Sequence, residues 1–310
     1  MGITPGCLNK TGMIQFKNIG IEDKAWLTSR LLQQNGRDCN LSFVNLFSWH
    51  FLTKSSYAII DNVLVMSCCF HREGRVYMLP ERQGDMSALL WKLREHAEAE
   101  GHPLRIHGVY PSLSEWLDGE FPGKFCYHRN RDTFDYLYSR RELVELKGKD
   151  FQAKRNHVNR FKRSYQYRYE PLTRELIPQC IELEEKWCKK HDCEDEESLT
   201  LERIALTKAL THFEALSLLG GLLWVGDEIV AFTYGAPITQ DTFGVHIEKA
   251  DTEIDGAYNV INQEFARHIP EQYTYLNREE DLGLPGLRKA KLSYRPVMLL
   301  EKGFAEWMGE

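Results

Sequence analysis

The sequence predicts a mixed α/β fold made of one unit that occurs twice. Two observations lead to this prediction: an order of strands and helices that repeats along the chain, and enough apolar residues for a sizeable core. Of the 310 residues, 43% are hydrophobic and 27% are charged, as in globular proteins with one large or two medium domains. We therefore expect an α+β arrangement in which helices flank mixed sheets.

The first copy of the unit lies in the first half of the chain. Tyr57–Phe70 is expected to form a strand pair around a turn at Asp61-Asn62, and Val76–Pro80 a third strand. Gly84–Glu100 carries apolar residues at helical spacing, and Leu104–Tyr110 is the strand that follows. The predicted order is thus three strands, a helix and a strand.

The second half repeats this order. Its expected elements are strands over Ala215–Val225, Ile229–Pro237 and Thr242–Ala250, a helix over Gly256–His268 with Asp255 as N-cap, and a strand over Tyr273–Arg278. An order that occurs twice favours a duplicated unit over one doubly wound sheet. We place the boundary near residues 139–148, which gives an N-terminal domain over 1–140 and a C-terminal domain over 141–310.

The charge pattern allows only local binding of nucleic acid. The net charge of -6 and the pI near 6.0 give no general attraction to phosphates. Residues 147–168, however, carry eight cations against the single Asp150. Phe151, Val158 and Phe161 would share one face of a helix there, leaving the cations around His157 to contact a phosphate or RNA backbone. The alternative is a solvated helix paired with the acidic stretch Glu182–Glu197.

The cysteines and apolar runs indicate a cytoplasmic protein without membrane insertion. The eight cysteines show no paired framework, so reduced thiols are expected. Cys188, His191 and Cys193 have no second ligand pair nearby, and no metal site is expected. The longest apolar run is far too short to span a bilayer.

Ionisable residues gather where the last predicted strand meets its loop. The run from Tyr273 to Pro296 joins an aromatic strand to three carboxylates, a Gly/Pro loop and a cationic segment. Ligands bind at such strand ends in open α/β sheets, so we expect a site there. The loop Asp251–Gly256 lacks the bidentate Glu of a calcium loop and is too acidic for a pyrophosphate, so a cationic group suits it better.

Three residues are candidates for proton transfer. Glu248 shares a strand face with His246, and either Glu248 or Glu279 could accept a proton from an attacking amine or hydroxyl. Tyr294 could protonate a leaving group. Two structural alternatives remain open: Arg278 beside the carboxylates could form an internal ion pair, and Tyr294 could be a packing residue.

Four motifs resemble one known family over nearly the whole chain. They are KRNHVNRF at 154–161, HIEKADTEIDGAY at 246–258, YLNREEDLG at 275–283 and GLRKAKLSYRP at 286–296. Together they look like the uncharacterised bacterial proteins classed with the C-terminal domain of phosphatidylglycerol lysyltransferase. The resemblance implies two tandem GNAT-like acyltransferase units, in agreement with the repeated order of elements.

The resemblance also implies a reaction. The better-known relatives, lipid lysyltransferases and Fem-type aminoacyltransferases, move an aminoacyl group from a charged tRNA to an amine or hydroxyl. Lys154, Arg155, Lys289 and Lys291 match the cationic parts that face the tRNA end. Two departures matter. The membrane-spanning half of the lipid enzymes is missing, which disfavours a lipid acceptor, and the loop at 251–256 lacks the GNAT pyrophosphate signature, which disfavours acyl-coenzyme A there.

The preferred hypothesis is an acyltransferase, most specifically an aminoacyltransferase, acting on a small-molecule or peptide acceptor. The donor would be aminoacyl-tRNA or a coenzyme A thioester. The alternatives are an acetyl-coenzyme A-dependent N-acetyltransferase with its donor site in the first half, and a GNAT-like binding protein without catalysis. The candidate catalytic residues are Glu248, Glu279 and Tyr294, and the candidate substrate- or donor-binding residues are Lys154, Arg155, His157, Asp251, Asn277, Arg278, Lys289 and Lys291.

Overall fold

The chain consists of two compact units, each assembled from separate stretches of sequence. The computed structural model describes residues 14–33, 36–70, 74–80, 82, 84–190 and 196–309. Unit 1 takes Met1–Asp135, Glu280–Gly283 and Leu300–Glu310, and unit 2 takes Tyr136–Glu279 and Leu284–Leu299. The described residues contain no helix that is long and apolar enough to cross a membrane.

Unit 1 is built on a mixed sheet. Within the described residues the sheet has seven strands in the order β1-β2-β3-β4-β5-β14-β6. The strands are β1 (Lys17–Asn18), β2 (Ser56–Ile60), β3 (Val63–Phe70), β4 (Gly74–Met78), β5 (Arg105–His107), β6 (Phe125–Arg129) and β14 (Gly303–Trp307). The α-helices of the unit are α1 (Lys24–Leu31), α2 (Phe43–Ser48), α3 (His50–Thr53), α4 (Met86–Ala99) and α5 (Pro111–Glu120). Only β4 and β5 pair in parallel in this described sheet.

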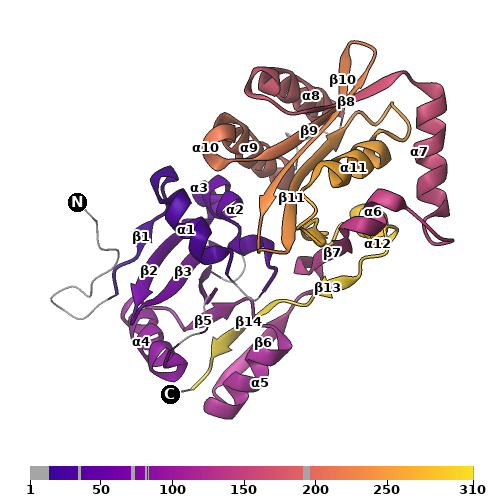
Figure 1. Cartoon of the computed structure of the whole chain (residues 1–310). Coiled ribbons are helices and arrows are strands. Elements are labelled where there is room, and N and C mark those ends of the chain that lie inside the picture. The colour runs from indigo at the N-terminus through magenta and orange to yellow at the C-terminus, as the bar shows by residue number, and fades with distance from the viewer. Residues whose placement is uncertain are drawn as a thin grey trace. The chain divides into compact units, whose positions relative to one another are not determined.

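The last strand of the chain completes the first sheet. Figure 1 shows β14, in yellow, between β5 and β6 of the indigo and magenta unit. Ala305 of β14 pairs with Ile106 on one side and with Tyr127 on the other, antiparallel to both strands. Ala305 and Trp307 are buried in the core of unit 1. No periodic signal in the sequence predicted this return.

Unit 2 is built on a second mixed sheet. Among the described residues this sheet also has seven strands, in the order β13-β7-β12-β11-β10-β9-β8. The strands are β7 (Asp135–Ser139), β8 (Tyr167–Pro171), β9 (Leu219–Val225), β10 (Glu228–Pro237), β11 (Thr242–Ala250), β12 (Tyr275–Asn277) and β13 (Met298–Leu300). Its α-helices are α6 (Arg140–Glu145), α7 (Gln152–Ser164), α8 (Ile177–Lys190), α9 (Glu197–Thr211), α10 (Phe213–Leu216), α11 (Ala257–His268) and α12 (Pro285–Leu292).

The two sheets repeat one topology, which confirms the predicted duplication. In each, an antiparallel ladder ends in a parallel pair whose strands are joined through a helix: β4-α4-β5 in unit 1 and β11-α11-β12 in unit 2. Beyond the parallel pair lies an antiparallel strand from a distant part of the sequence, β14 or β7. The fold class is therefore α+β, with two mixed sheets flanked by helices.

Two local predictions were wrong. The strand expected from Ala215 begins only at Leu219, because Phe213–Leu216 forms α10 and Ser217 ends that helix with φ 53°. Asp255 does not cap α11; Gly256 is the N-cap, with φ 89°. A side chain at Gly256 would meet the His157 carbonyl oxygen at 3.0 Å, so glycine lets the start of α11 pack closely against α7.

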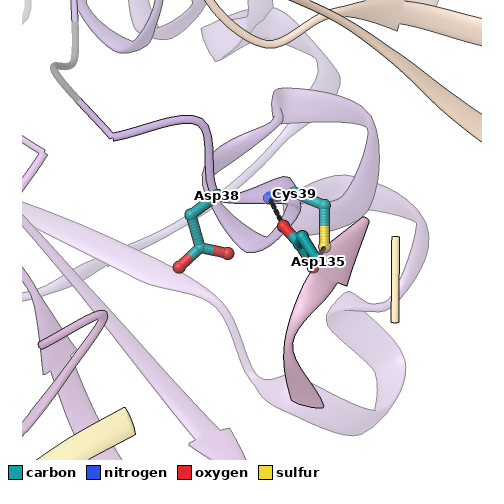
Figure 2. A group of neighbouring side chains, drawn as sticks. All are labelled: Asp38, Cys39 and Asp135. Carbon is teal, nitrogen blue, oxygen red and sulfur yellow. Dashed lines mark hydrogen bonds between the residues drawn. The ribbon is translucent and has the colours of Figure 1, made fainter. Parts of the chain in front are cut away.

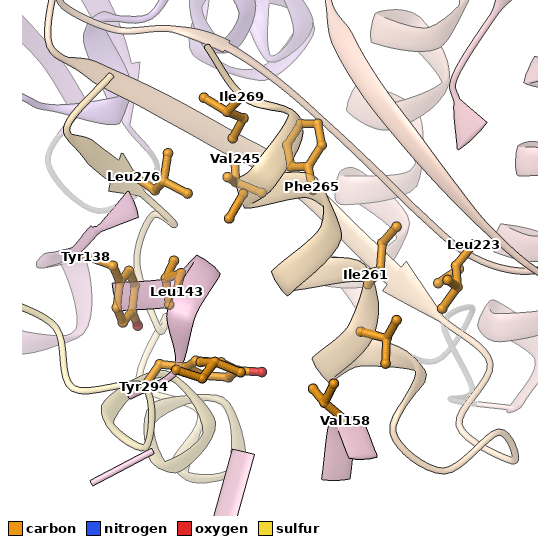
Figure 3. Close-up of a cluster of buried hydrophobic side chains, with 14 of the residues drawn as sticks. Tyr138, Leu143, Val158, Leu223, Val245, Ile261, Phe265, Ile269, Leu276 and Tyr294 are labelled. Carbon is orange, nitrogen blue, oxygen red and sulfur yellow. The ribbon is translucent and has the colours of Figure 1, made fainter. Parts of the chain in front are cut away.

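The core of unit 2 positions the basic helix α7. Phe151, Val158 and Phe161 are buried, as the spacing predicted. They belong to one cluster with apolar residues of α11 and of the sheet, including Ile261 and Val245, part of which Figure 3 shows. Each buried apolar side chain contributes about 1.5–3 kcal/mol. The apolar face of α7 is thus fixed, and its polar residues are held at the surface.

One cysteine differs from the prediction of reduced thiols. Cys188, near the end of α8, takes part in a disulfide. Among the described residues, the free cysteines are Cys39, Cys68, Cys69, Cys126 and Cys180. His191 and Cys193, considered above as metal ligands, lie outside the described residues.

A buried lysine joins four distant stretches of unit 1. The Lys302 ammonium lies 3.0 Å from Asp38, 2.8 Å from Asp135 and 2.7 Å from Glu280, and its side chain is fully buried. Burial alone opposes the charge of Lys302, but the Asp135 and Asp38 carboxylates outweigh it and hold its pKa well above the ordinary value. Burial also raises the pKa of Glu280 to about 7.

The same carboxylates have the spacing of a metal site. Asp38, Cys39 and Asp135, drawn in Figure 2, offer ligand atoms that lie within 4.8 Å of one another. The Lys302 ammonium contacts oxygens of both aspartates, so a cation already faces this donor set. We assign the group to the lysine-centred ion cluster of unit 1.

Replacing Lys302 tests the role of this cluster. In Lys302→Met the two aspartates would stay buried without their cation, which we expect to lower the free energy of unfolding by about 3–5 kcal/mol. The measurement is urea unfolding followed by tryptophan fluorescence. The control is Lys289→Met, because Lys289 is exposed. Equal stability of the two variants would show that the cluster does not stabilise unit 1.

Candidate functional site

The candidate site of unit 2 lies where two parallel strands separate. β11 and β12 pair only from Thr242 opposite Tyr275 to Gly244 opposite Asn277. β11 then continues to Ala250, whereas β12 ends at Asn277. Side chains beyond Gly244 and Asn277 therefore lie at the carboxyl ends of diverging strands, the usual ligand position in open α/β sheets.

A β-bulge lies at the point of divergence. On the other side of β11, Tyr234 pairs with Ile247 while Gly235 pairs with Val245, so His246 is an extra residue in the strand. Bulges of this kind redirect side chains and are common beside active sites. The His246 side chain is only 3% exposed, and its Nδ1 lies 2.8 Å from Glu279 Oε1.

Glu279 is held in an uncommon backbone conformation. Its φ is 58°, in the left-handed region that non-glycine residues rarely adopt. The backbone N–H of Glu279 donates to Asn277 Oδ1 at 2.7 Å, and its carbonyl oxygen accepts from the Tyr136 N–H. Its side chain is 26% exposed. Strain of this kind persists where surrounding contacts fix it, often at functional sites.

Glu248 serves a different set of partners. Arg278 Nη2 donates to Glu248 Oε1 at 2.8 Å, and Asn262 Nδ2 of α11 donates to Glu248 Oε2 at 3.0 Å. The side chains of Glu248 and Arg278 are 11% and 13% exposed. The internal ion pair considered for Arg278 is thus present, with Glu248 as its partner. Glu248 and Glu279 both lie beyond the paired part of the two strands.

Tyr294 lies between two cations. The Lys154 Nζ is 4.0 Å from the centre of the Tyr294 ring, and the Arg278 guanidinium carbon is 5.0 Å from it. The Tyr294 hydroxyl accepts a hydrogen bond from Asn259 Nδ2 at 2.6 Å, so its own proton can still be donated. Burial raises the pKa of Tyr294 to about 12, which keeps the phenol protonated.

The Lys154 ammonium is poorly compensated. Burial, followed by repulsion from Arg278, lowers the pKa of Lys154 to about 8. The nearby Glu248 opposes this shift, but its carboxylate already bonds to Arg278 and Asn262. A lysine with such a pKa is partly neutral near physiological pH, and it binds an anion or exchanges a proton more readily than a surface lysine.

Other predicted site residues are engaged elsewhere. Arg155 donates to the backbone carbonyls of Leu146 and Gly148, and Lys291 donates to the Arg278 carbonyl at 2.6 Å. His157 lies 3.1 Å from Arg160, and Asp251 lies 2.9 Å from Lys190. Lys289 is exposed on α12. The structure therefore places Lys154 and Arg278 beside the Tyr294 ring, with Glu248 bonded to Arg278. Glu279 pairs with His246 instead.

Between the described residues of the basic helix and those of the acidic stretch Glu182–Glu197, the structure has no ion pair. Within the described residues, the ion pairs of the α7 cations are Arg160 with Asp255 and Lys162 with Glu264. Neither carboxylate belongs to Glu182–Glu197, of which residues 191–195 are not described.

Three polar partners were missing from the residues predicted for the site. Asn259 and Asn262 of α11 hold Tyr294 and Glu248, and they lie three positions apart, a spacing that places both on one helix face. That spacing was a usable signal. For His246 only its shared strand face with Glu248 was visible, because a bulge leaves no mark in the alternation of residues.

Comparison with known proteins identifies relatives over most of the chain. The family model described as "Phosphatidylglycerol lysyltransferase, C-terminal" matches residues 30–304. A crystal structure of a conserved protein of unknown function from Bacteroides thetaiotaomicron VPI-5482 is 49% identical, covers 96% of this chain and 100% of that chain, and has a TM-score of 0.92.

More distant solved structures share the fold. The C-terminal domain of a lysylphosphatidylglycerol synthetase from Agrobacterium fabrum is 16% identical over 93% of this chain and 92% of that chain, with a TM-score of 0.63. FemX is 9% identical over 95% and 97%, with a TM-score of 0.61. An uncharacterized protein of Mycoplasmoides gallisepticum is 25% identical, and the match spans 61% of this chain but only 60% of that protein. The two solved structures have the same fold as this chain.

Direct titration of Lys154 tests the electrostatics of this site. After reductive ¹³C-methylation, the Lys154 signal is expected to titrate near pH 8, because burial and Arg278 lower its pKa to about 8. Arg278→Gln removes the repelling charge and should move the midpoint upward by ~1 unit. Arg295→Gln is the control, since Arg295 pairs with Asp150 at the surface. A Lys154 midpoint above pH 10 in the wild-type protein would contradict this description.

Proposed function

Because the chain belongs to the phosphatidylglycerol lysyltransferase C-terminal family, we propose that it is a transferase that moves an acyl group, most specifically an aminoacyl group, onto an amine or hydroxyl. The observation that carries this proposal is the group of polar residues at the diverging ends of β11 and β12. It combines a partly exposed carboxylate, a protonated phenol and a cation of lowered pKa, three of the parts that acyl transfer needs.

Glu279 is assigned as the general base. The acceptor nitrogen or oxygen attacks the acyl carbonyl carbon, and its proton passes to the Glu279 carboxylate. Glu279 is preferred to Glu248 because its side chain is the more exposed, at 26% against 11%. Glu248 is assigned the support of Arg278, whose guanidinium it bonds. The sequence left Glu248 and Glu279 as alternative bases, and this assignment selects Glu279.

Tyr294 and Lys154 are assigned to the other half of the reaction. As the carbonyl carbon becomes tetrahedral, negative charge develops on its oxygen, and the Lys154 ammonium can stabilise that charge. The bond to the leaving oxygen or sulfur then breaks. The Tyr294 hydroxyl, which accepts from Asn259 and retains its proton, donates that proton to the leaving group.

The surroundings of α11 favour an aminoacyl ester over a coenzyme A thioester. A pyrophosphate would have to sit at the loop before α11, where Asp251 pairs with Lys190 and Asp255 pairs with Arg160. These carboxylates repel phosphates. The Agrobacterium fabrum relative carries the name of a lysylphosphatidylglycerol synthetase. We therefore propose an aminoacyl-tRNA donor, with Lys154, Arg278 and the exposed Lys289 on the donor side.

A donor screen tests the proposed function. The full chain is incubated with radiolabelled aminoacyl-tRNAs or with acyl-coenzyme A species, each with amine and hydroxyl acceptors, and transfer of label is measured. Transfer from aminoacyl-tRNA alone supports the proposal. Transfer from acyl-coenzyme A alone would show that the donor is a coenzyme A thioester instead. If no donor raises the melting temperature and none supports transfer, the binding-protein alternative is favoured.

Substitution of the assigned base gives a second prediction. Glu279→Gln keeps the shape of the side chain but cannot accept the proton, so kcat is expected to fall ~10²–10⁴-fold. The melting temperature should change little, because the side chain is partly exposed. The matched control is Glu301→Gln, an exposed glutamate of unit 1. Full activity of Glu279→Gln would remove Glu279 from the mechanism.

A further inference from the structure

We infer that His246 is a positioning residue that holds Glu279 in the orientation required of the base. The inference rests on the proposed function for the role of Glu279, and on the geometry of unit 2 for the role of His246. Three features of the backbone converge on this single pair of side chains: the bulge at His246, the glycine before it, and the left-handed conformation of Glu279.

The bulge gives His246 its direction. Tyr234 pairs with Ile247 and Gly235 with Val245, so the register of β10 and β11 skips His246. In a regular register its side chain would follow the strict alternation of the strand. The extra residue breaks that alternation where β12 has just left β11, and the imidazole reaches across to the residue that follows β12 by two positions.

Gly244 leaves room for the ring. A Cβ at Gly244 would lie 3.1 Å from His246 Cε1 and 2.8 Å from Ile238 Cδ1. Both distances are shorter than a comfortable carbon–carbon contact of about 3.5–4.0 Å. Glycine at this position therefore avoids a steric clash. As a result, the imidazole can pack against the strand.

The side chains of His246 and Glu279 differ in burial, which indicates different roles. The His246 side chain is 3% exposed and that of Glu279 is 26% exposed, so an acceptor meets the carboxylate first and the imidazole stands behind it. Nδ1–H donates to Glu279 Oε1. A hydrogen bond to the ionised form favours that form and fixes the side-chain rotamer. His246 thus acts through Glu279 and need not touch the substrate.

The backbone completes the arrangement. Glu279 adopts φ 58°, and its N–H is held by the buried Asn277 side chain at 2.7 Å. The hydrogen bond from His246 restricts the rotamers of this carboxylate. The pair therefore gives a physical reason for the strain: it presents one carboxylate oxygen to His246 while the side chain stays partly open.

The titratable groups near Glu279 come from several elements of unit 2. His246 approaches from β11 and the phenol of Tyr234 from β10; burial raises the pKa of Tyr234 well above its ordinary value, so it stays neutral. Arg278 precedes Glu279 in the chain, but its guanidinium bonds to Glu248. Lys291 of α12 donates to the Arg278 carbonyl. The His246 imidazole is thus in direct hydrogen-bond contact with the Glu279 carboxylate.

A pair of substitutions separates positioning from packing. In His246→Asn the side-chain nitrogen is attached to Cγ, as Nδ1 is in histidine, so the donor to Glu279 is retained. His246→Leu fills similar space without a donor. The first readout needs no substrate. It is the pH titration of the ¹³C signal of the Glu279 carboxyl carbon, which is assigned because the signal disappears in Glu279→Gln. The second is the pH profile of kcat/KM with whichever donor the screen identifies.

His246→Leu is expected to raise the Glu279 midpoint by ~1 pH unit and to move the acidic limb of the profile by the same amount, with a fall in kcat of ~10-fold or more. His246→Asn should restore most of both. The control is His128→Leu, an exposed histidine of unit 1. An unchanged Glu279 titration in His246→Leu, or equal loss in both His246 variants, would overturn the inference. If His246→Leu fails to fold, the comparison of His246→Asn with His246→Gln carries the same test.

Discussion

The buried ammonium of Lys302 is the interaction on which the construction of unit 1 depends. It contacts carboxylates from the turn before α2, from the first residue of β7 and from the segment after β12. These stretches are far apart in sequence. A buried charge without its opposite partner is strongly destabilising, so the lysine and its carboxylates depend on one another. A buried ion cluster of this kind specifies which segments meet more strictly than apolar packing does, because only the complete set is compensated.

The duplicated topology gives each unit a parallel strand pair whose ends carry titratable side chains. In unit 2 the strand ends carry Glu248, Arg278 and Glu279, and Lys154 and Arg278 both lie against the Tyr294 ring. In unit 1 the paired strand ends Met78 and His107 line a small cavity together with Asp38 and Tyr110. Burial lowers the pKa of His107 to about 4, so the histidine there is neutral. The same topology thus carries different side chains at the strand ends of the two units.

Periodicity and spacing predicted the parts of this structure that depend on local sequence. The β2–β3 pair, α4, α7 and the hairpin of β9 and β10 all lie close to their predicted residues, because their apolar patterns match one side of an element. What the sequence did not indicate depends on distant contacts. The insertion of β14 beside β5, the bulge at His246 and the use of Lys291 as a donor to a backbone carbonyl each require knowledge of a neighbour. For the candidate site, the sequence indicated an ion pair of Arg278 with a nearby carboxylate, but not that Glu248 is the partner and that Glu279 bonds to His246.

The position of β14 also bears on how the chain is made. β5 and β6 are synthesised early, yet the strand between them, Gly303–Trp307, leaves the ribosome only after all of unit 2. Until then the facing edges of β5 and β6 lack their partner, and unpaired strand edges are prone to intermolecular pairing. Domains generally fold in order of synthesis, but here the unit that begins first is completed last. The sheet of unit 1 therefore stays incomplete while unit 2 is synthesised. We expect a chaperone to bind unit 1 during this period.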